Sequence, residues 1–236
     1  MQPLLVLWDV DYTLADADGA GRRLYQLAFA EMFGGKLPAA SSMAGRTDRA
    51  IVLEVLTLAG IAEPHKHVAR FEALLAKHAP ALTDAVRASG RALPGAAAAI
   101  AALAAITDHR IVQSLLTGNI REMAEVKLRP LGLGDRLDFD AGAYGSESAV
   151  RSDLVTVARR RAAARYGTEF AGQATVVVGD TPLDVEAAVI SAARAVGVAT
   201  GQFTMRDLAA AGADAVIPDL TDTDQVVAAI LGRDPV

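Results

Sequence analysis

The chain has 236 residues, of which 52% are hydrophobic and 22% charged, and its formal net charge is −5. This composition excludes a disordered or fibrous chain, and the length suits either one large domain or a core that carries a smaller inserted domain. The acidic balance argues against an extended nucleic-acid-binding surface. Because the chain contains no cysteine, it has no disulfides, no thiolate metal sites and no cysteine nucleophile.

The sequence shows no candidate membrane span and no secretory signal. Its first apolar run, residues 4–8, has no basic segment before it and ends at Asp9. The lack of cysteine also fits a reducing compartment. We therefore expect a soluble, cytoplasmic protein with no membrane partner.

The predicted elements change in character along the chain. A buried strand at residues 4–8 is followed by helical patterns alone, and after Pro94 and Gly95 strands alternate with helices. The helices of the first block are predicted at residues 20–33, 47–59 and 65–87. The later strands are predicted at residues 110–116, 137–141, 174–178, 195–198 and 215–217, and the helices around them at 96–106, 120–131, 152–166 and 183–192, with two more toward the carboxyl end.

This alternation predicts an α/β fold with a Rossmann-like parallel sheet whose two faces are covered by helices. The strands are apolar throughout, as expected of strands that are buried on both faces. Because the helical block interrupts the alternation after the first strand, we predict an inserted α-helical cap domain at residues 16–88. The core domain would then comprise residues 1–15 and 89–236.

Polar residues follow three of the predicted strands, at the edge of the sheet where open α/β folds bind ligands. Asp9 and Asp11 follow the first strand, residues 117–119 follow the second, and Asp180 and Asp184 follow the third. Carboxylates that meet in one crevice repel one another unless a cation compensates them or some are protonated. Mg²⁺ prefers oxygen ligands and is the natural counter-ion.

The second of these segments adds groups that suit an anion. The Thr117 hydroxyl and the Gly118 amide are donors at the start of the next helix, which is a favourable position for phosphate. Acidic residues, a hard cation and an anion site together indicate phosphoryl chemistry, with a carboxylate as a possible nucleophile.

At these segments the sequence resembles the haloacid dehalogenase-like (HAD) hydrolase superfamily. Residues 9–14 resemble its first motif, DxDxT[LV], residues 117–119 its second, and residues 179–184 its fourth, GDxxxD. The chain is most similar to the phosphoglycolate phosphatase-like branch with a helical cap. The resemblance implies a HAD-like fold and a Mg²⁺-dependent phosphatase that acts on a small phosphate monoester, phosphoglycolate-like or a sugar phosphate, through an aspartyl-phosphate.

The resemblance also assigns roles to the matching residues. Asp9 would attack phosphorus, and Asp11 would act as general acid for the leaving oxygen and then as general base for water. The Mg²⁺ ligands would be Asp9, the backbone carbonyl of Asp11, and Asp180, with Asp184 as a fourth participant. The transferring phosphoryl group would be bound by Thr117, Gly118 and Asn119.

Two cationic residues are further candidates for the site. The third motif of the family normally supplies a lysine just ahead of a helix, and here Arg151 stands at the corresponding place. We prefer Arg151 for this role over Lys127, which lies inside a predicted helix and is interpreted as a surface cation. In the cap, Arg46 occupies the place of the family's specificity loop, either as a contact to an anionic substrate group or as a solvated side chain at a helix-capping turn.

Two other functions remain compatible with the motifs. The chain is either a phosphatase, a phosphomutase of the beta-phosphoglucomutase type, or a non-catalytic phospho-ligand-binding protein on the same fold. A dehalogenase is disfavoured, because the acid/base residue Asp11 is typical of the phosphoryl-transfer members. We expect a small phosphorylated metabolite as partner, no nucleic acid, and a monomer or a homodimer.

Overall fold

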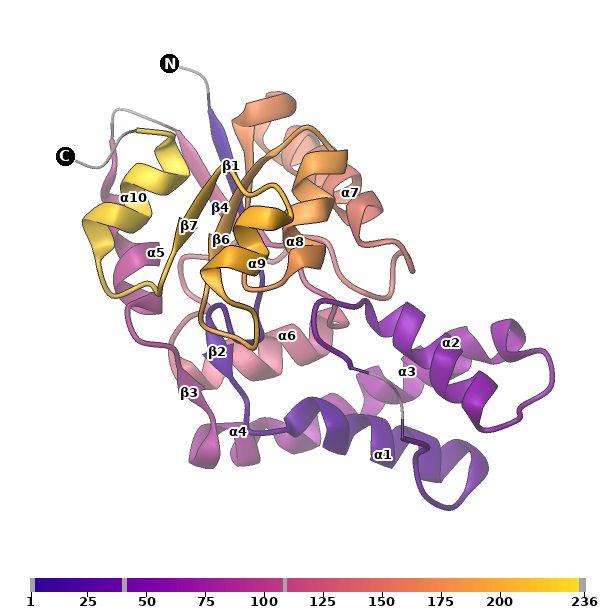
Figure 1. The fold of residues 1–236 in the computed structure, drawn as a ribbon. Helices are drawn as coiled ribbons and strands as arrows, with labels where there is room; N and C mark the ends of the chain where they lie inside the picture. The colour runs from indigo at the N-terminus through magenta and orange to yellow at the C-terminus, as the bar shows by residue number, and fades with distance from the viewer. Residues whose placement is uncertain (1–2, 40–41, 108–109, 234–236) are drawn as a thin grey trace.

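The computed structural model describes residues 3–39, 42–107 and 110–233. Its centre is a five-stranded sheet of order β4-β1-β5-β6-β7, in which every neighbouring pair is parallel (Figure 1). The predicted α/β class with a parallel sheet is therefore confirmed. The strands are β1 (Leu4–Trp8), β4 (Ile111–Leu115), β5 (Thr175–Gly179), β6 (Arg194–Val198) and β7 (Ala215–Ile217).

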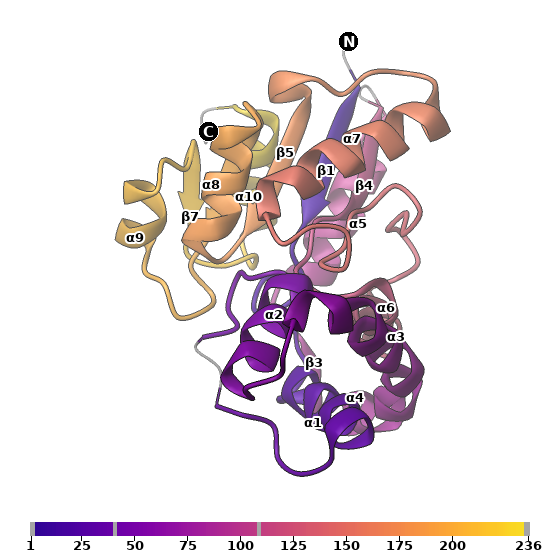
Figure 2. The ribbon, with the colours of Figure 1, turned by 90° about the vertical axis from the view of Figure 1, so that its right-hand side faces the viewer.

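Helices cover both faces of this sheet, because successive strand residues point to opposite sides. In β1, Val6 and Trp8 pack into one apolar cluster with α5 and α10, and Leu5 and Leu7 pack into another with α7, α8 and α9. Figure 2 shows α7 and α8 in front of the strands with α5 behind them. The bounds of these helices are α5 (Ala96–Ala105), α7 (Arg151–Tyr166), α8 (Pro182–Ile190), α9 (Met205–Ala210) and α10 (Thr223–Leu231).

A second group of helices lies beyond one edge of the sheet, below it in Figure 1. They surround an apolar cluster of their own, in which the Tyr25 and Phe71 rings lie 5.8 Å apart between centroids. Met123 and Val126 of α6 (Arg121–Leu128), together with Ile120 directly before it, complete this cluster, so a helix that follows β4 closes the core of the helical block. The helices of the block are α1 (Ala20–Phe33), α2 (Asp48–Leu58), α3 (Val68–His78) and α4 (Thr83–Ser89).

The chain enters and leaves the helical block at a short antiparallel ladder. Strands β2 (Ala15–Asp16) and β3 (Arg91–Ala92) pair there, and an ion pair of 2.7 Å joins the side chains of Asp16 and Arg91. The two crossings therefore lie side by side. This arrangement is consistent with a cap of residues 16–88 inserted into a discontinuous core, and that division stays a prediction.

The prediction of a strand at residues 137–141 is wrong. This segment forms turns, and only Ala143 makes an isolated parallel bridge, to Leu116 beyond the end of β4. Its apolar side chains alternate with aspartates and are buried, which produces the period of a strand. The backbone nevertheless makes only separate hydrogen bonds to β4. For example, the Asp138 amide donates to the Gln113 carbonyl at 2.9 Å, and no continuous ladder forms.

The single helix predicted at residues 65–87 is also wrong in its continuity. Helix α3 ends at His78, and Pro80 lies in a 3₁₀ turn (Ala79–Leu82) that precedes α4. Proline has no amide hydrogen and clashes with the preceding turn, so it interrupts the α-helix. In the described part of the chain, no helix combines the length and the hydropathy that a membrane span requires.

Candidate active site

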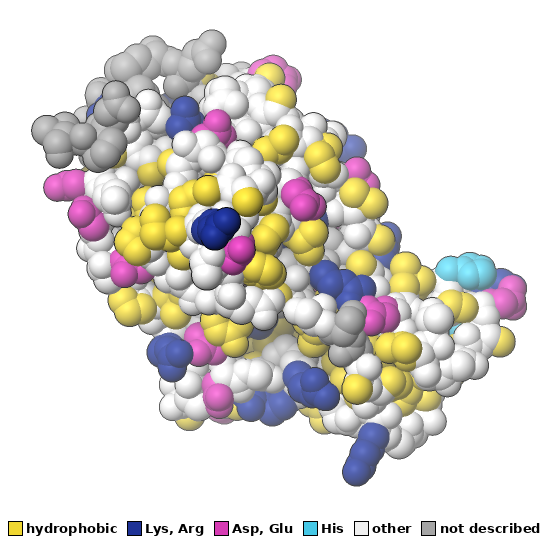
Figure 3. Space-filling view, in the orientation of Figure 1, with side chains coloured by type: hydrophobic (Ala, Val, Ile, Leu, Met, Phe, Trp, Pro, Cys, Tyr) yellow, Lys and Arg dark blue, Asp and Glu magenta, His cyan; other side chains and the backbone are white. Residues whose placement is uncertain are grey.

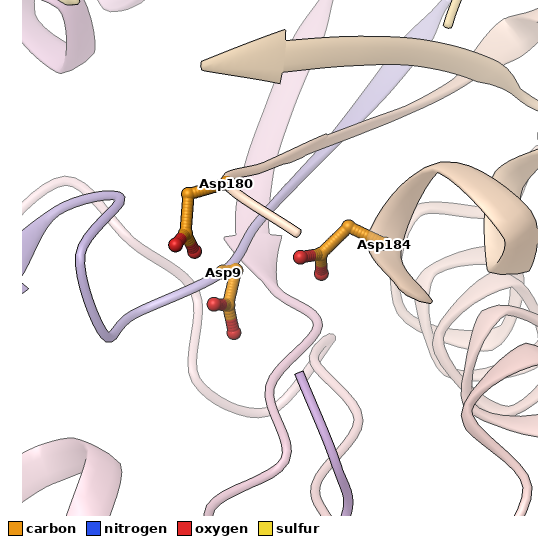
Figure 4. Close-up of side chains that lie close together, drawn as sticks. All are labelled: Asp9, Asp180 and Asp184. Atoms are coloured by element: carbon orange, nitrogen blue, oxygen red, sulfur yellow. The ribbon is translucent and has the colours of Figure 1, made fainter. Parts of the chain in front are cut away.

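Three aspartates meet at the carboxyl ends of neighbouring strands (Figure 4). Asp9 follows β1 and Asp180 follows β5, and because these strands pair in register at Trp8 and Val178, the residues after them come together. Asp184 lies in the first turn of α8. One carboxylate oxygen from each of the three lies within 4.8 Å of the others, and the residues are only 5%, 3% and 1% exposed.

Burial makes this cluster electrostatically strained. The pKa of Asp9 is raised from 3.8 to about 7, chiefly by burial and also by the charges of Asp184 and Asp11, while the Arg151 guanidinium acts in the opposite direction. Burial likewise raises the pKa of Asp180 to about 9, with further contributions from the neighbouring carboxylates. The cluster thus carries more negative charge than the surrounding protein compensates, which favours a bound cation.

Arg151 contacts the cluster from the first turn of α7. Its Nη2 donates to the Asp9 carboxylate at 2.9 Å and to the Asp184 carboxylate at 2.5 Å, and its Nη1 donates to the Gly45 carbonyl at 2.9 Å. Among the described residues, its buried Nε has no hydrogen-bond partner. A buried donor without a partner is uncommon in folded proteins, and this one belongs to the side chain that contacts Asp9.

The carboxylate oxygens of the three aspartates are suitable ligands for a hard cation such as Mg²⁺, which prefers oxygen ligands. Asp184 is already held: one oxygen accepts from Arg151, and the other accepts from the amide and hydroxyl of Thr181 at 3.1 and 2.7 Å. Asp180 accepts a hydrogen bond of 3.3 Å from the Thr13 hydroxyl and another from its own backbone amide. Asp9 and Asp180 therefore offer the most free lone pairs, and Asp184 serves chiefly to hold Arg151.

The second predicted segment lies beside the first at the end of β4. Thr117 is fully buried, and its hydroxyl accepts a bond of 2.8 Å from the amide group of Asn119. The same amide group donates to the Asp11 carboxylate at 2.8 Å. Gly118 is required sterically, because a Cβ at this position would lie 2.0 Å from the carbonyl oxygen of Arg46.

The interpretation of Lys127 as a surface cation is wrong. This residue is 3% exposed, and its Nζ lies 2.6 Å from both carboxylate oxygens of Asp11 and 2.7 Å from the Asn119 side-chain oxygen. Ile120, Met123 and Lys127 share one face of a helical wheel, so a lysine in line with apolar residues was the available signal. The interpretation failed because this face of α6 packs toward the helical block and the cavity.

Apart from Asp184, these groups line one cavity of about 240 Å³ between the sheet and the helical block. Figure 3 shows Lys and Arg side chains on the surface along this boundary. Arg46 lines the cavity and its guanidinium pairs with Glu54, and its contact to an anionic substrate group stays a prediction. The helical block contributes mainly apolar or small residues to the lining: Ala17, Gly19, Ala20, Gly21, Leu24, Tyr25, Met43, Ala44, Gly45 and Ile51.

Asp48 joins the helical block to the second segment and was not recognised in the sequence. Its amide donates to the Gly118 carbonyl at 2.6 Å, and its carboxylate accepts from the Ile120 amide at 2.6 Å and the Tyr25 hydroxyl at 2.7 Å. Burial raises the pKa of this carboxyl to about 6. In the sequence, an acid directly after Thr47 looks like an ordinary residue of a helix start.

Comparison with known families and structures agrees with this geometry. A sequence model of the haloacid dehalogenase-like hydrolases matches residues 6–188, whereas no curated protein matches the chain. A hydrolase from Pseudomonas syringae is 22% identical, with 94% of this chain and 95% of that chain covered and a TM-score of 0.65.

Two further solved structures are similar to this chain. A predicted phosphatase from Clostridium acetobutylicum is 16% identical, with coverages of 96% and 99% and a TM-score of 0.67. A putative beta-phosphoglucomutase from Bacteroides vulgatus is 14% identical, with coverages of 98% and 90% and a TM-score of 0.64. At these identities the similarity demonstrates a shared fold.

Proposed function

The chain belongs to the haloacid dehalogenase-like hydrolases, and from this premise we propose that it is a Mg²⁺-dependent phosphatase of small phosphate monoesters. One observation carries the proposal: three neighbouring carboxylates, two of them with a pKa raised chiefly by burial, lie against a buried arginine at one cavity. Such a site suits a cation and a phosphoryl group together. Neither ligand alone balances both the excess carboxylates and the unpaired donor of Arg151.

In this proposal Asp9 is the nucleophile. Its carboxylate oxygen forms a bond to phosphorus as the bond between phosphorus and the leaving oxygen breaks, which yields an aspartyl-phosphate. Asp11 gives a proton to the leaving oxygen, and then takes a proton from the water that attacks phosphorus and restores Asp9. Thr117 and Arg151 stabilise the phosphoryl oxygens by hydrogen bonds that are already oriented before the reaction.

Asp9, Asp180 and the Asp11 carbonyl are the groups we assign to Mg²⁺, with Asp184 behind them. When bound, the ion compensates the charge of the carboxylates and of the phosphoryl oxygens. Asp184 keeps Arg151 beside Asp9 through its bond of 2.5 Å. The capping bonds of Thr181 fix the orientation of Asp184 in turn.

The cavity limits the size of the substrate. A volume of about 240 Å³ accommodates a phosphate and a leaving group of a few non-hydrogen atoms, such as a phosphoglycolate-like or small sugar phosphate. A phosphomutase on this site would pass the phosphoryl group to a second substrate hydroxyl instead of water. One of the similar structures is described as a putative beta-phosphoglucomutase, so the test below includes this outcome.

The test is a phosphate-release screen over small phosphomonoesters with Mg²⁺ or with EDTA. We expect turnover only with the divalent cation, loss of at least about 100-fold in Asp9→Asn, and a phosphorylated Asp9 peptide in quenched wild-type enzyme. The matched control is Asp84→Asn, since the Asp84 side chain is 93% exposed on the helical block. Control activity should equal that of the wild type.

Three results would contradict the proposal in distinguishable ways. Turnover that survives Asp9→Asn excludes the aspartyl-phosphate route. Interconversion of sugar phosphates without phosphate release identifies a mutase. Ligand binding without any turnover identifies a phospho-ligand-binding protein.

A further inference from the structure

We propose that Lys127 is a positioning residue that holds Asp11, so that the two acids of the first motif are each held by a separate cation. The inference rests on the proposed function, because it concerns how the general acid is oriented. It also changes the choice made from the sequence. Arg151 and Lys127 are not alternatives for one role but occupy two different places in the site.

The contacts divide the site into two halves. On one side, Arg151 bonds the carboxylates of Asp9 and Asp184. On the other, Lys127 bonds both oxygens of Asp11 at 2.6 Å and the oxygen of Asn119 at 2.7 Å. Asn119 completes a closed set, since its amide group also donates to Asp11.

Asp11 needs such support more than Asp9 does. Its side chain is 40% exposed toward the cavity, whereas that of Lys127 is 4% exposed. A half-exposed carboxylate rotates freely unless neighbouring groups bond it, and an acid that points away from the leaving oxygen transfers no proton. Because Lys127 contacts both oxygens, one contact persists when the other oxygen carries the proton.

The surroundings of Lys127 also favour a fixed geometry. The side chain starts on α6, and its Nζ lies beneath α1, where a Cβ built on Gly21 would be 3.8 Å away. A buried ammonium is costly to desolvate and is tolerated when its bonds are satisfied, as they are here by Asp11 and Asn119. Lys127 acts only through Asp11.

This role predicts a dependence on the leaving group. An alkyl phosphate needs its leaving oxygen protonated, whereas p-nitrophenol leaves readily as an anion. We expect Lys127→Met to lower kcat/KM for an alkyl phosphate about 100-fold and for p-nitrophenyl phosphate less than about tenfold. Arg151→Met should lower both by a similar factor, because it acts on Asp9 and the phosphoryl group.

Two further measurements separate positioning from direct binding. In the Asp11→Asn background, Lys127→Met should change kcat/KM by less than about twofold, because its effect passes through Asp11. Calorimetry with inorganic phosphate should give the same affinity for wild type and Lys127→Met, but a weaker affinity for Arg151→Met. Lys77→Met is the matched control, since Lys77 is 60% exposed and pairs with Glu31 on the surface.

The outcomes are distinct. Equal losses for both leaving groups, a full Lys127→Met effect without Asp11, or loss of phosphate affinity would each overturn the positioning role. A wild type that releases no phosphate from any ester contradicts the proposed function, and the phosphate affinities then still test Lys127. Lys127→Gln, which keeps an uncharged hydrogen-bond donor group, should give intermediate values, and it provides the same test if Lys127→Met does not fold.

Discussion

Among single residues, Asp180 shows how a buried acid opposes folding until it is compensated. The pKa of its carboxyl is about 9 in the folded protein, compared with a usual value of 3.8. The folded state therefore binds a proton that the unfolded chain releases above about pH 4. Since the folded state holds more protons, the stability contributed by this group falls as the pH rises toward 9. Asp9, with a pKa of about 7, acts in the same direction.

We predict that Asp180→Asn stabilises the metal-free protein at alkaline pH. In EDTA the Tm of the wild type should fall between pH 5 and pH 9 more steeply than that of the variant. Added Mg²⁺ should reverse the order at pH 8, because the ion binds the folded wild type and contributes about 2.7 kcal/mol at 100 times its Kd. Thermal scans of both proteins and of Asp84→Asn measure this, and a Mg²⁺ shift retained in Asp180→Asn would exclude Asp180 as a ligand.

The sequence predicts the site positions of the motif residues, but not those of site residues outside the motifs. Asp9 and Asp180 are predictable because each directly follows an apolar strand, and the ends of parallel strands share one edge. Lys127 and Asp48 are not, because their roles depend on the helical block folding against α6. No local pattern records that contact.

At the scale of elements, α2 is joined to the sheet through Asp48. Its buried carboxylate, with a pKa of about 6, binds the start of α6 through the Ile120 amide and binds α1 through the Tyr25 hydroxyl. The Tyr25 bond lowers the pKa of Asp48, while burial raises it. The stability that Asp48 contributes therefore decreases as the pH rises from about 4 to about 6.

We predict that Tyr25→Phe destabilises the protein in a pH-dependent manner. Loss of a hydrogen bond to a charged group costs about 1.5–3 kcal/mol at pH 8, and less at pH 5, where Asp48 takes up a proton more readily. Urea unfolding at the two pH values measures the difference. Tyr144→Phe is the control, because its hydroxyl donates to the uncharged Phe139 carbonyl, and its smaller cost should not change with pH. A Tyr25→Phe cost independent of pH would contradict the role of Asp48.

For the whole molecule, the apolar cluster of the helical block, which α6 completes, links this block to the sheet. Residues of α6 complete the apolar core of the block, while α6 itself follows β4 directly. Opening the block exposes apolar surface on α6 as well as its own. We therefore expect the two parts to unfold together, although the chain crosses between them twice.

Trp8 allows this to be measured, since it is the only tryptophan in the chain and is fully buried in the sheet. Its fluorescence reports the sheet, whereas far-ultraviolet circular dichroism also reports the helical block. We predict coincident transitions in urea. Phe71→Ala, in the core of the block, should shift both by about 3–5 kcal/mol. Leu58→Ala, at a 54% exposed side chain, should shift neither measurably. A circular-dichroism transition that precedes the fluorescence change would show separate unfolding.

Local sequence patterns are enough to predict the parallel sheet, most of its helices, and the acids at the strand ends. These features follow from the period of apolar residues and from where each period stops, which are properties of neighbouring positions. The tertiary structure decided the rest. Residues 137–141 have the period of a strand but find no ladder partner, and Lys127 has the sequence context of a surface residue but lies buried beside Asp11. Both depend on contacts between segments far apart in the chain, and only the folded molecule brings those segments together.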